Sequence, residues 1–163
     1  MTARRLLAVL ALLVAIPLVW SWWSSDRRRI GRQIDRLEER VEKSGEETAI
    51  VGAARARAVT DLFASDFEVR ARQLRFRTRD RQELARFVLR HRSSTDAIDL
   101  RIVTESLSLA PEHGRATQVA TLEFLTGGPL SSSAERYRVQ VNWVIERGSW
   151  RIDYIDLLEV VVR

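Results

Sequence analysis

The C-terminal part of the chain, residues 135–162, limits the possible folds more than any other stretch. In its first half apolar and polar residues alternate, which is the period-two pattern of a strand with one buried face. The apolar set is Tyr137, Val139, Val141, Trp143 and Ile145. Residues 146–149 offer a turn containing Gly148, and the alternation resumes at Trp150. We therefore predict a β-hairpin, and its aromatic face needs further elements to cover it because a two-stranded ribbon is not stable alone.

The composition indicates one domain with a single core and a short appendage, since 45% of the 163 residues are hydrophobic. The net charge of +5 comes almost wholly from arginine, because Lys43 is the only lysine. Arginine enrichment also follows from a GC-rich genome, so we do not predict nucleic acid as a partner. The chain contains no cysteine, which excludes disulfides, thiolate metal sites and cysteine nucleophiles.

An uncharged segment from Leu6 to Trp23 follows two arginines near the N-terminus. As a helix, its 18 or so residues would measure roughly 27 Å, about the thickness of a bilayer's hydrocarbon layer. Two interpretations are open: a membrane anchor over residues 1–25, or a signal peptide cleaved after Ser21. The length, the absence of an A-x-A site and the terminal tryptophans favour the anchor. The residues predicted at the membrane interface are Trp20, Trp22, Trp23, Arg27, Arg28 and Arg29.

The charges around this segment point to two different orientations. Two arginines precede it and five follow it within residues 27–36, a count that by itself places the domain in the cytoplasm. A short basic tail directly before an apolar segment is typical of a signal anchor with its N-terminus inside. We therefore predict a single-pass protein of a bacterial inner membrane, with the lipid bilayer as a partner and the soluble domain in the periplasm.

Two helical patterns come next. Residues 26–45 carry apolar residues spaced 4, 3 and 4 apart, which predicts an amphipathic stalk helix and a linker. These residues are Ile30, Ile34, Leu37 and Val41. The stalk could form a dimer seam, or it could lie on its own domain or on lipid headgroups. Residues 46–64 predict a second helix, whose wide apolar stripe, beginning at Ile50, should pack on the sheet.

The remaining stretch predicts strands around one more helix. Residues 66–77 favour a strand with a bulge, and Asp80 with Glu83 is a capping box that starts a helix reaching Arg92. Strands are expected near residues 98–109 and 116–126, followed by a polar loop over residues 127–133. The fold class is therefore α+β: an N-terminal transmembrane helix, an amphipathic stalk helix, then helices packed on a curved antiparallel sheet.

Three segments carry a resemblance to a known superfamily. LFASDFEVR, RDRQELARFVLRH and VNWVIERGSWRIDYID resemble the nuclear-transport-factor-2-like (cystatin-like cone) superfamily, and the likeness covers residues 46–163. It implies a cone of curved sheet wrapped around helices. The superfamily includes isomerases, cyclases, dehydratases, transport adaptors and soluble domains of secretion-machine proteins. Its enzymes use an Asp, or an Asp and His pair, that projects into the cone.

The titratable residues do not reproduce that catalytic pattern. His91 ends a predicted helix and His113 lies in a turn, so we expect both to be structural or solvated. Asp61, Asp66 and Asp99 lie near the ends of predicted elements. We therefore predict no catalytic residue, no cofactor-binding residue and no metal ligand, and an enzymatic activity is not favoured.

A run of arginines is the most conspicuous charged feature. Arg70 and Arg72 should share one face of the predicted strand, and Arg75 and Arg77 should share a face beyond the bulge. We predict these four as partner-binding residues that contact anionic headgroups or an acidic protein surface. The alternative is a solvated strand face whose arginine stems cover apolar surface.

Three functions are open at this point. The favoured one is a non-enzymatic, membrane-anchored accessory subunit that docks on a larger membrane complex or forms a homodimer. The second is a small-molecule-binding or lyase/isomerase-type cone domain, and the third is an inner-membrane component resembling those of type IV secretion machines. A deep cavity with an inward-facing Asp or His would favour the second, and a cone filled by Trp143, Trp150 and Tyr154 would exclude it.

Overall fold

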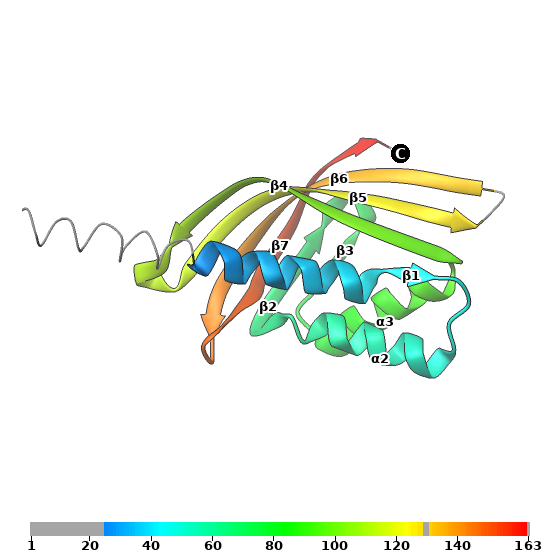
Figure 1. Cartoon of the computed structure of the whole chain (residues 1–163), viewed down its shortest axis with the longest axis horizontal. Helices are drawn as coiled ribbons and strands as arrows, with labels where there is room; N and C mark the ends of the chain where they lie inside the picture. The colour runs from blue at the N-terminus through cyan, green and yellow to red at the C-terminus, as the bar shows by residue number, and fades with distance from the viewer. Residues whose placement is uncertain (1–24, 129–130, 163) are drawn as a thin grey trace, which may run out of the picture.

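The computed structural model describes residues 25–128 and 131–162, and within them a curved seven-stranded sheet has three helices against one face (Figure 1). The helices span residues 25–41, Ala49–Thr60 (α2) and Arg81–Ser93 (α3). The strands are β1 (Lys43–Ser44), β2 (Phe63–Ala71), β3 (Phe76–Thr78), β4 (Ala97–Ala110), β5 (Arg115–Gly128), β6 (Ser131–Glu146) and β7 (Ser149–Val162), with short 3-10 turns η1 (Arg72–Leu74) and η2 (Pro111–His113). Across the sheet the order is β1-β4-β5-β6-β7-β2-β3.

The α+β class is confirmed, but the sheet is mixed, where we predicted an antiparallel one. Strands β4 to β7 form the expected antiparallel meander. In contrast, β2 lies parallel to β7, with Val69 opposite Ile155. Parallel neighbours need a long crossover connection, and here the whole stretch between the two strands supplies it. The alternation within each strand carries no information on such a distant pairing.

The predicted C-terminal hairpin is confirmed. Its two strands meet at Arg147 and Gly148, which both have positive φ (51° and 76°), the geometry of a tight two-residue hairpin turn. Trp143 pairs with Ile152 across the two strands, so their side chains share the inner face.

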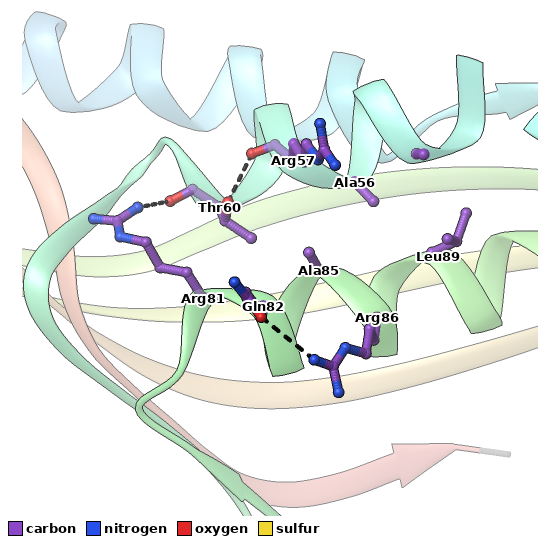
Figure 2. A pocket seen from close by; sticks show the side chains of 9 residues that line it. Ala56, Arg57, Thr60, Arg81, Gln82, Ala85, Arg86 and Leu89 are labelled. Atoms are coloured by element: carbon purple, nitrogen blue, oxygen red, sulfur yellow. Dashed lines mark hydrogen bonds between the residues drawn. The ribbon is translucent and has the colours of Figure 1, made fainter. Parts of the chain in front are cut away.

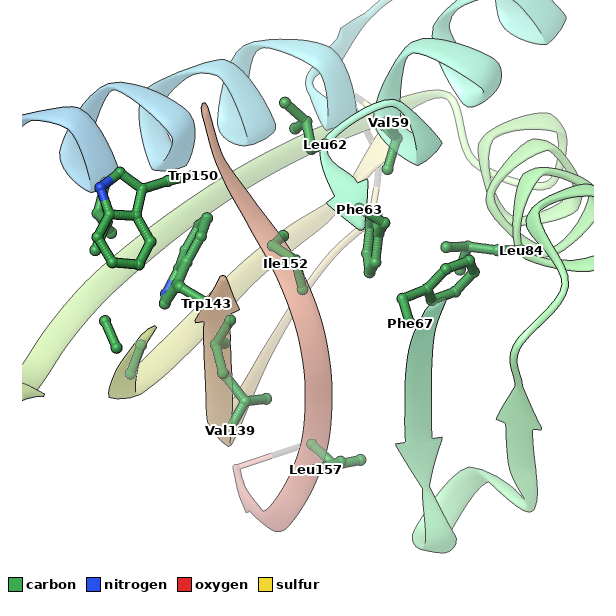
Figure 3. Packing of buried hydrophobic residues seen from close by; sticks show 14 of the residues in the cluster. Val59, Leu62, Phe63, Phe67, Leu84, Val139, Trp143, Trp150, Ile152 and Leu157 are labelled. Atoms are coloured by element: carbon green, nitrogen blue, oxygen red, sulfur yellow. The ribbon is translucent and has the colours of Figure 1, made fainter. Parts of the chain in front are cut away.

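The two tryptophans of this hairpin fill one end of the space between helices and sheet (Figure 3). Trp143 and Trp150 are each 2% exposed. Their indole N–H groups are both satisfied: Trp143 donates to Gln118 Oε1 at 2.9 Å, and Trp150 donates to Asp26 Oδ1 at 3.2 Å. The second bond joins the start of the first described helix to the last hairpin.

The helix over residues 25–41 lies on its own domain, which was one of the interpretations left open for the stalk. Ile30 is fully buried, and Ile34, Leu37 and Val41 pack against the core. This helix also covers an edge of the sheet, because Glu38 Oε1 accepts the backbone N–H of Ile102 in β4 at 2.6 Å. Covering an edge in this way blocks unwanted strand pairing.

The second helix is shorter than the predicted span of residues 46–64. It begins at Ala49 after the cap residue Thr48, and Phe63 already belongs to β2. Ile50 is 83% exposed, so the predicted apolar stripe does not face the sheet along its whole length. Small residues make the buried face instead: a Cβ on Gly52 would lie 3.4 Å from the Leu89 side chain of α3.

Two other predicted segments have different structures. Residues 66–77, predicted as one bulged strand, form an antiparallel hairpin of β2 and β3 that reverses through η1, with Arg75 left-handed at φ 51°. Within the predicted polar loop of residues 127–133, residues 127–128 and 131–133 extend the ladder between β5 and β6, with Gly127 opposite Ser132. The other two residues of that loop lie outside the described residues.

Within residues 25–128 and 131–162, no helix has both the length and the hydropathy needed to span a membrane. Residues 1–24 of the predicted anchor, with Trp20, Trp22 and Trp23, lie outside the described residues.

Candidate functional site

An apolar cavity of about 240 Å³ lies between α3 and the inner face of the sheet. The first helix, α3 and strands β2, β4, β5, β6 and β7 all contribute to its wall. Phe87 and Val88 come from α3, Leu122 and Phe124 from β5, and Tyr137 from β6. The cavity is therefore built by two helices and five strands and not by one loop.

The strand alternation places these side chains on one face. Leu122 lies opposite Tyr137 in the ladder between β5 and β6, so both point inward. The rings of Phe124 and Tyr137 meet edge to face with centroids 5.9 Å apart. Phe87 stacks on Phe76 of β3 at 4.3 Å, which holds its ring at the rim. Aromatic pairs of this kind fix the shape of the wall.

The cone is only partly filled by the residues that we expected to plug it. Trp143 and Trp150 are buried at the end near the first helix, whereas Tyr154 is half-buried and lies opposite Asn142, outside the buried cluster. None of these three residues lines the cavity. An open apolar space therefore remains beside the tryptophan-filled part.

The polar groups at the cavity are His91, Arg92, Arg70, Glu135 and Tyr137. The Tyr137 hydroxyl donates to the carboxylate of Glu135. Arg92 is 2% exposed and binds Glu47 and the carbonyls that end the first helix. His91 is exposed at the wall, a position that its place near a helix end did not predict.

The other titratable candidates lie elsewhere. Asp66 and Asp99 are exposed on strands, and Asp61 caps the end of α2. His113 is exposed in η2, 3.9 Å from Glu112. In the part of the chain that the structure describes, no three His, Cys, Asp or Glu side chains are placed to hold a metal ion.

The four arginines predicted to bind a partner come together on the β2–β3 hairpin, but in a different arrangement from the predicted ridge. Arg70 and Arg77 are cross-strand neighbours, while Arg72 and Arg75 lie at the tip of the hairpin. Together with Phe76 they line a depression of about 400 Å³.

Sequence reasoning missed Glu68, which organises this hairpin. Its carboxylate accepts hydrogen bonds from Arg70, from Arg77 at 2.8 Å and from Arg79 at 2.5 Å. The hydrogen bonds from Arg70 and Arg79, with a smaller contribution from Arg77, lower the pKa of Glu68 from 4.5 to about 2. A glutamate at a polar position of an alternating strand pattern is expected to be exposed to solvent. The sequence therefore did not predict that Glu68 binds three arginines.

A third hollow, of about 520 Å³, lies between α2 and α3 (Figure 2). Its apolar lining includes Ala53, Ala56 and Ala85. Among its polar side chains, Thr60, Arg81 and Arg86 donate hydrogen bonds to neighbouring atoms. Arg81 donates to the carbonyl of Thr60, the last residue of α2, at 2.5 Å, and so caps this helix. It also donates to the carbonyls of Phe63 and Ala64 at the start of β2. This groove between two helices has a structural explanation, so we take the apolar cavity as the candidate site.

Comparison with known proteins supports the fold. No family model matches the chain, and no curated protein does. Solved structures do. A protein of unknown function from Mycobacterium tuberculosis shares 16% identity over 88% of this chain and 75% of its own, with a TM-score of 0.65. A nuclear-transport-factor-2-like protein with a cystatin-like fold from Novosphingobium aromaticivorans shares 15% identity over 97% and 91%, with a TM-score of 0.62.

The chain has the nuclear-transport-factor-2-like cone fold. A scytalone dehydratase-like protein from Novosphingobium aromaticivorans is also similar, with 13% identity over 85% of each chain and a TM-score of 0.65. At such identities the likeness concerns the fold alone, because this superfamily fold hosts many unrelated activities. Function must therefore be argued from the residues at the cavity.

Proposed function

We propose that this nuclear-transport-factor-2-like domain is a non-enzymatic binding module that takes a small apolar group into its cavity. The observation that carries the proposal is the cavity wall, where hydrophobic side chains from seven elements converge. Ligand pockets usually measure about 300–1,000 Å³ and are lined mainly by apolar and aromatic groups. With about 240 Å³, this cavity is the right size for a single ring or a short alkyl chain.

Binding without chemistry is supported by the polar groups at the wall. A general acid or base must reach the reacting group and have a pKa suited to the transfer. Arg92 is held by Glu47 and by backbone carbonyls, and Glu135 accepts from Tyr137. These contacts give Arg92 and Glu135 structural partners within the domain, and Glu68 does the same for Arg70.

The test uses the absence of cysteine, because a single introduced thiol reports on one position. Leu122→Cys places the thiol in the cavity wall, and Leu125→Cys places it on the same strand at a side chain that is 51% exposed. We would measure the reaction of each full-length variant with a small methanethiosulfonate in the presence of single-ring aromatics and short alkyl alcohols.

We expect at least one compound to slow the reaction of the Leu122→Cys thiol several-fold without changing that of Leu125→Cys. Partition of a compound into detergent would affect both variants equally. Equal rates with and without every compound at both positions would contradict the proposal.

A lyase or isomerase acting in the same cavity is the second candidate, and the observation that favours it is His91 at the wall. Compounds that protect the Leu122→Cys thiol would be incubated with the native chain and analysed by mass spectrometry. Conversion that His91→Gln abolishes while protection persists would establish the enzyme. Unchanged compounds would support the binding module.

We also propose that the module is tethered to a membrane by residues 1–25, as an accessory subunit in a bacterial inner membrane with its domain in the periplasm. The apolar segment of the sequence supports this, together with Arg27, Arg28 and Arg29, which are exposed in the first described turn. Carbonate extraction tests the membrane tether. Labelling of the Leu125→Cys thiol in intact cells with an impermeant maleimide tests whether the domain lies on the periplasmic side of the membrane. Release by carbonate, or protection from the maleimide, would contradict it.

As an accessory subunit, the chain would bind either a larger membrane complex or a second copy of itself. Extraction in mild detergent, followed by size and mass analysis, should give a particle larger than one chain. A solitary monomer would count against an accessory role.

A further inference from the structure

We propose that the depression at the tip of the β2–β3 hairpin is a binding site for a phosphate-bearing anion. This depression adjoins the apolar cavity, since Arg70 contributes to both, but the inference does not depend on what the cavity binds. Residues 70–79 hold five arginines and no acidic residue. Four of them, Arg70, Arg72, Arg75 and Arg77, line one depression of about 400 Å³.

The hairpin fold brings these arginines together. On a single straight strand, the outermost of the four would lie seven residues apart, roughly 23 Å at 3.3 Å per residue. The reversal at η1 instead pairs Arg70 with Arg77 directly across the ladder. Convergence on one depression favours a compact anion with several charges over an extended acidic segment, which would need cations spread along a strip.

Glu68 orients the inner arginines, Arg70 and Arg77, and leaves the outer arginines at the hairpin tip, Arg72 and Arg75, available to a ligand. Its carboxylate binds Arg70 and Arg77, and Arg79 beside them, so one negative charge holds three guanidinium groups. Arg70 also lies over the ring of Tyr154, 5.5 Å from its centroid. Fixed guanidinium groups lose less entropy when they bind an anion, since they are already in place.

Arg72 and Arg75 are both exposed, and no carboxylate in the described part of the chain pairs with either side chain. Positive charges held close together repel one another, so an anion that bridges them is stabilised. Guanidinium groups match phosphate oxygens through paired, parallel hydrogen bonds, which favours phosphate as the ligand chemistry.

The hairpin tip lies far from the start of the first helix, where a membrane tether at residues 1–25 would join the domain. This position favours a free phosphate compound as the ligand over the headgroups of that membrane. Trp150 at the start of β7 contacts Asp26, while Gln73 in η1 donates to the carbonyl of Leu158. Eight residues of β7 separate the two contacts, roughly 26 Å. Figure 1 shows the start of the first helix and the C-terminal end of β7 well apart.

The experiment compares two double variants of the full-length chain in non-ionic detergent. Arg72→Gln with Arg75→Asn removes the two outer arginines, and asparagine tolerates the left-handed backbone at position 75. Arg86→Gln with Arg90→Gln removes the same charge from exposed positions on α3. Binding of inorganic pyrophosphate would be measured by calorimetry at several salt concentrations, with thermal unfolding as a check on folding.

We expect the native chain and the α3 variant to bind pyrophosphate alike, with an affinity that falls as salt rises. The hairpin variant should bind at least tenfold more weakly. Arg72→Lys with Arg75→Lys, which keeps the charge but loses the paired hydrogen bonds, should fall between them. Equal binding by the native chain and the hairpin variant would overturn the proposal, as would binding of poly-glutamate without binding of pyrophosphate.

A second arm separates the two sources of phosphate. Vesicles of phosphatidylglycerol and of phosphatidylcholine would be compared for capture of the chain held in nanodiscs. Pyrophosphate binding without preference for phosphatidylglycerol assigns the site to a free compound. A preference that the hairpin variant loses and the α3 variant keeps assigns it to a headgroup of a second membrane.

Discussion

Arg92 and Lys43 cap each other's helices. Arg92, which belongs to α3, caps the end of the first helix, and Lys43, which follows the first helix, caps the end of α3. Arg92, in the last turn of α3, donates to the carbonyls of Arg40 at 3.2 Å and Val41 at 2.5 Å, where the first helix ends. Lys43, just beyond that helix, donates to the carbonyl of Arg92 at 2.8 Å and that of Thr95 at 2.5 Å. Cations are favoured at both places because helix C-termini carry partial negative charge and unpaired carbonyls.

Glu47 completes this arrangement. It accepts from Arg92 at 2.9 Å through one oxygen and at 3.0 Å through the other. The hydrogen bond from Arg92 is the main cause of the lowered pKa of Glu47. The connection between the first two helices is therefore fixed to the end of α3, beside the cavity wall that Val41 and His91 help to form.

We predict that Arg92→Met destabilises the domain strongly. Removing the cation leaves the carbonyls of Arg40 and Val41 without this donor, and leaves Glu47 with the half-exposed Arg55 as its ion-pair partner. Breaking a buried pair in this way costs about 3–5 kcal/mol. Arg90→Met, on the exposed side of the same helix, is the control and should change little. Urea unfolding of the full chain followed by circular dichroism measures both, and equal midpoints would contradict the prediction.

Lys43→Met should cost less, about 0.5–1.5 kcal/mol, because it removes hydrogen bonds to carbonyls at a half-buried site. The double variant with Arg92→Met should lose less than the sum of the two single losses, since both side chains hold the same connection. The same unfolding assay gives the coupling. Strict additivity would mean that the two caps act independently.

Much of the fold followed from local patterns in the sequence, whereas the pairings over long distances did not. The alternation through Trp143 and Trp150 predicted the last hairpin, and Asp80 caps α3 as predicted, with Oδ1 accepting from the Gln82 N–H at 2.7 Å. Glu83 did not complete the capping box, because it accepts the Thr78 hydroxyl at 2.5 Å instead. Thr78 is a neighbour only once β3 has formed.

The candidate sites show the same limit. The reversal at Arg75 places an arginine at positive φ, where glycine or asparagine is usual, so the sequence carried no turn signal. Arg92 is one of three consecutive basic residues, and nothing in the sequence marks it as the buried one. His91 and Tyr137 reach the same cavity from α3 and β6, and only the assembled sheet brings them there.

The depressed pKa of Glu68 predicts a dependence of stability on pH. Because its pKa falls from 4.5 to about 2 on folding, the carboxylate stabilises the folded state above pH 4.5. That contribution is lost as the pH falls from 4.5 towards 2, where the carboxylate becomes protonated in the folded chain. Glu68→Gln should therefore be less stable than the native chain at pH 7, with the difference shrinking across this window. A difference that stays constant from pH 7 to pH 2 would contradict this assignment.

Trp143 and Gln118 share a buried hydrogen bond. We predict that substitutions of these two residues, each destabilising alone, partly compensate for each other when combined. Gln118 is 1% exposed, and besides accepting from the indole it donates to Thr104 Oγ1 at 2.7 Å. Gln118→Leu leaves the indole N–H of Trp143 without its acceptor in a dry site, which costs about 1–3 kcal/mol.

Trp143→Phe leaves the Gln118 carbonyl unpaired and also opens a small void, so it should cost at least as much. The double variant removes donor and acceptor together, and replacing both partners by apolar groups restores much of the loss. We therefore expect Gln118→Leu to be far less harmful in the Trp143→Phe background than alone, by about 1 kcal/mol or more. Urea unfolding of all four chains measures the cycle. Simple additivity would show that the indole finds another acceptor, and that this bond does not fix the orientation of Trp143 in the closed end of the cone.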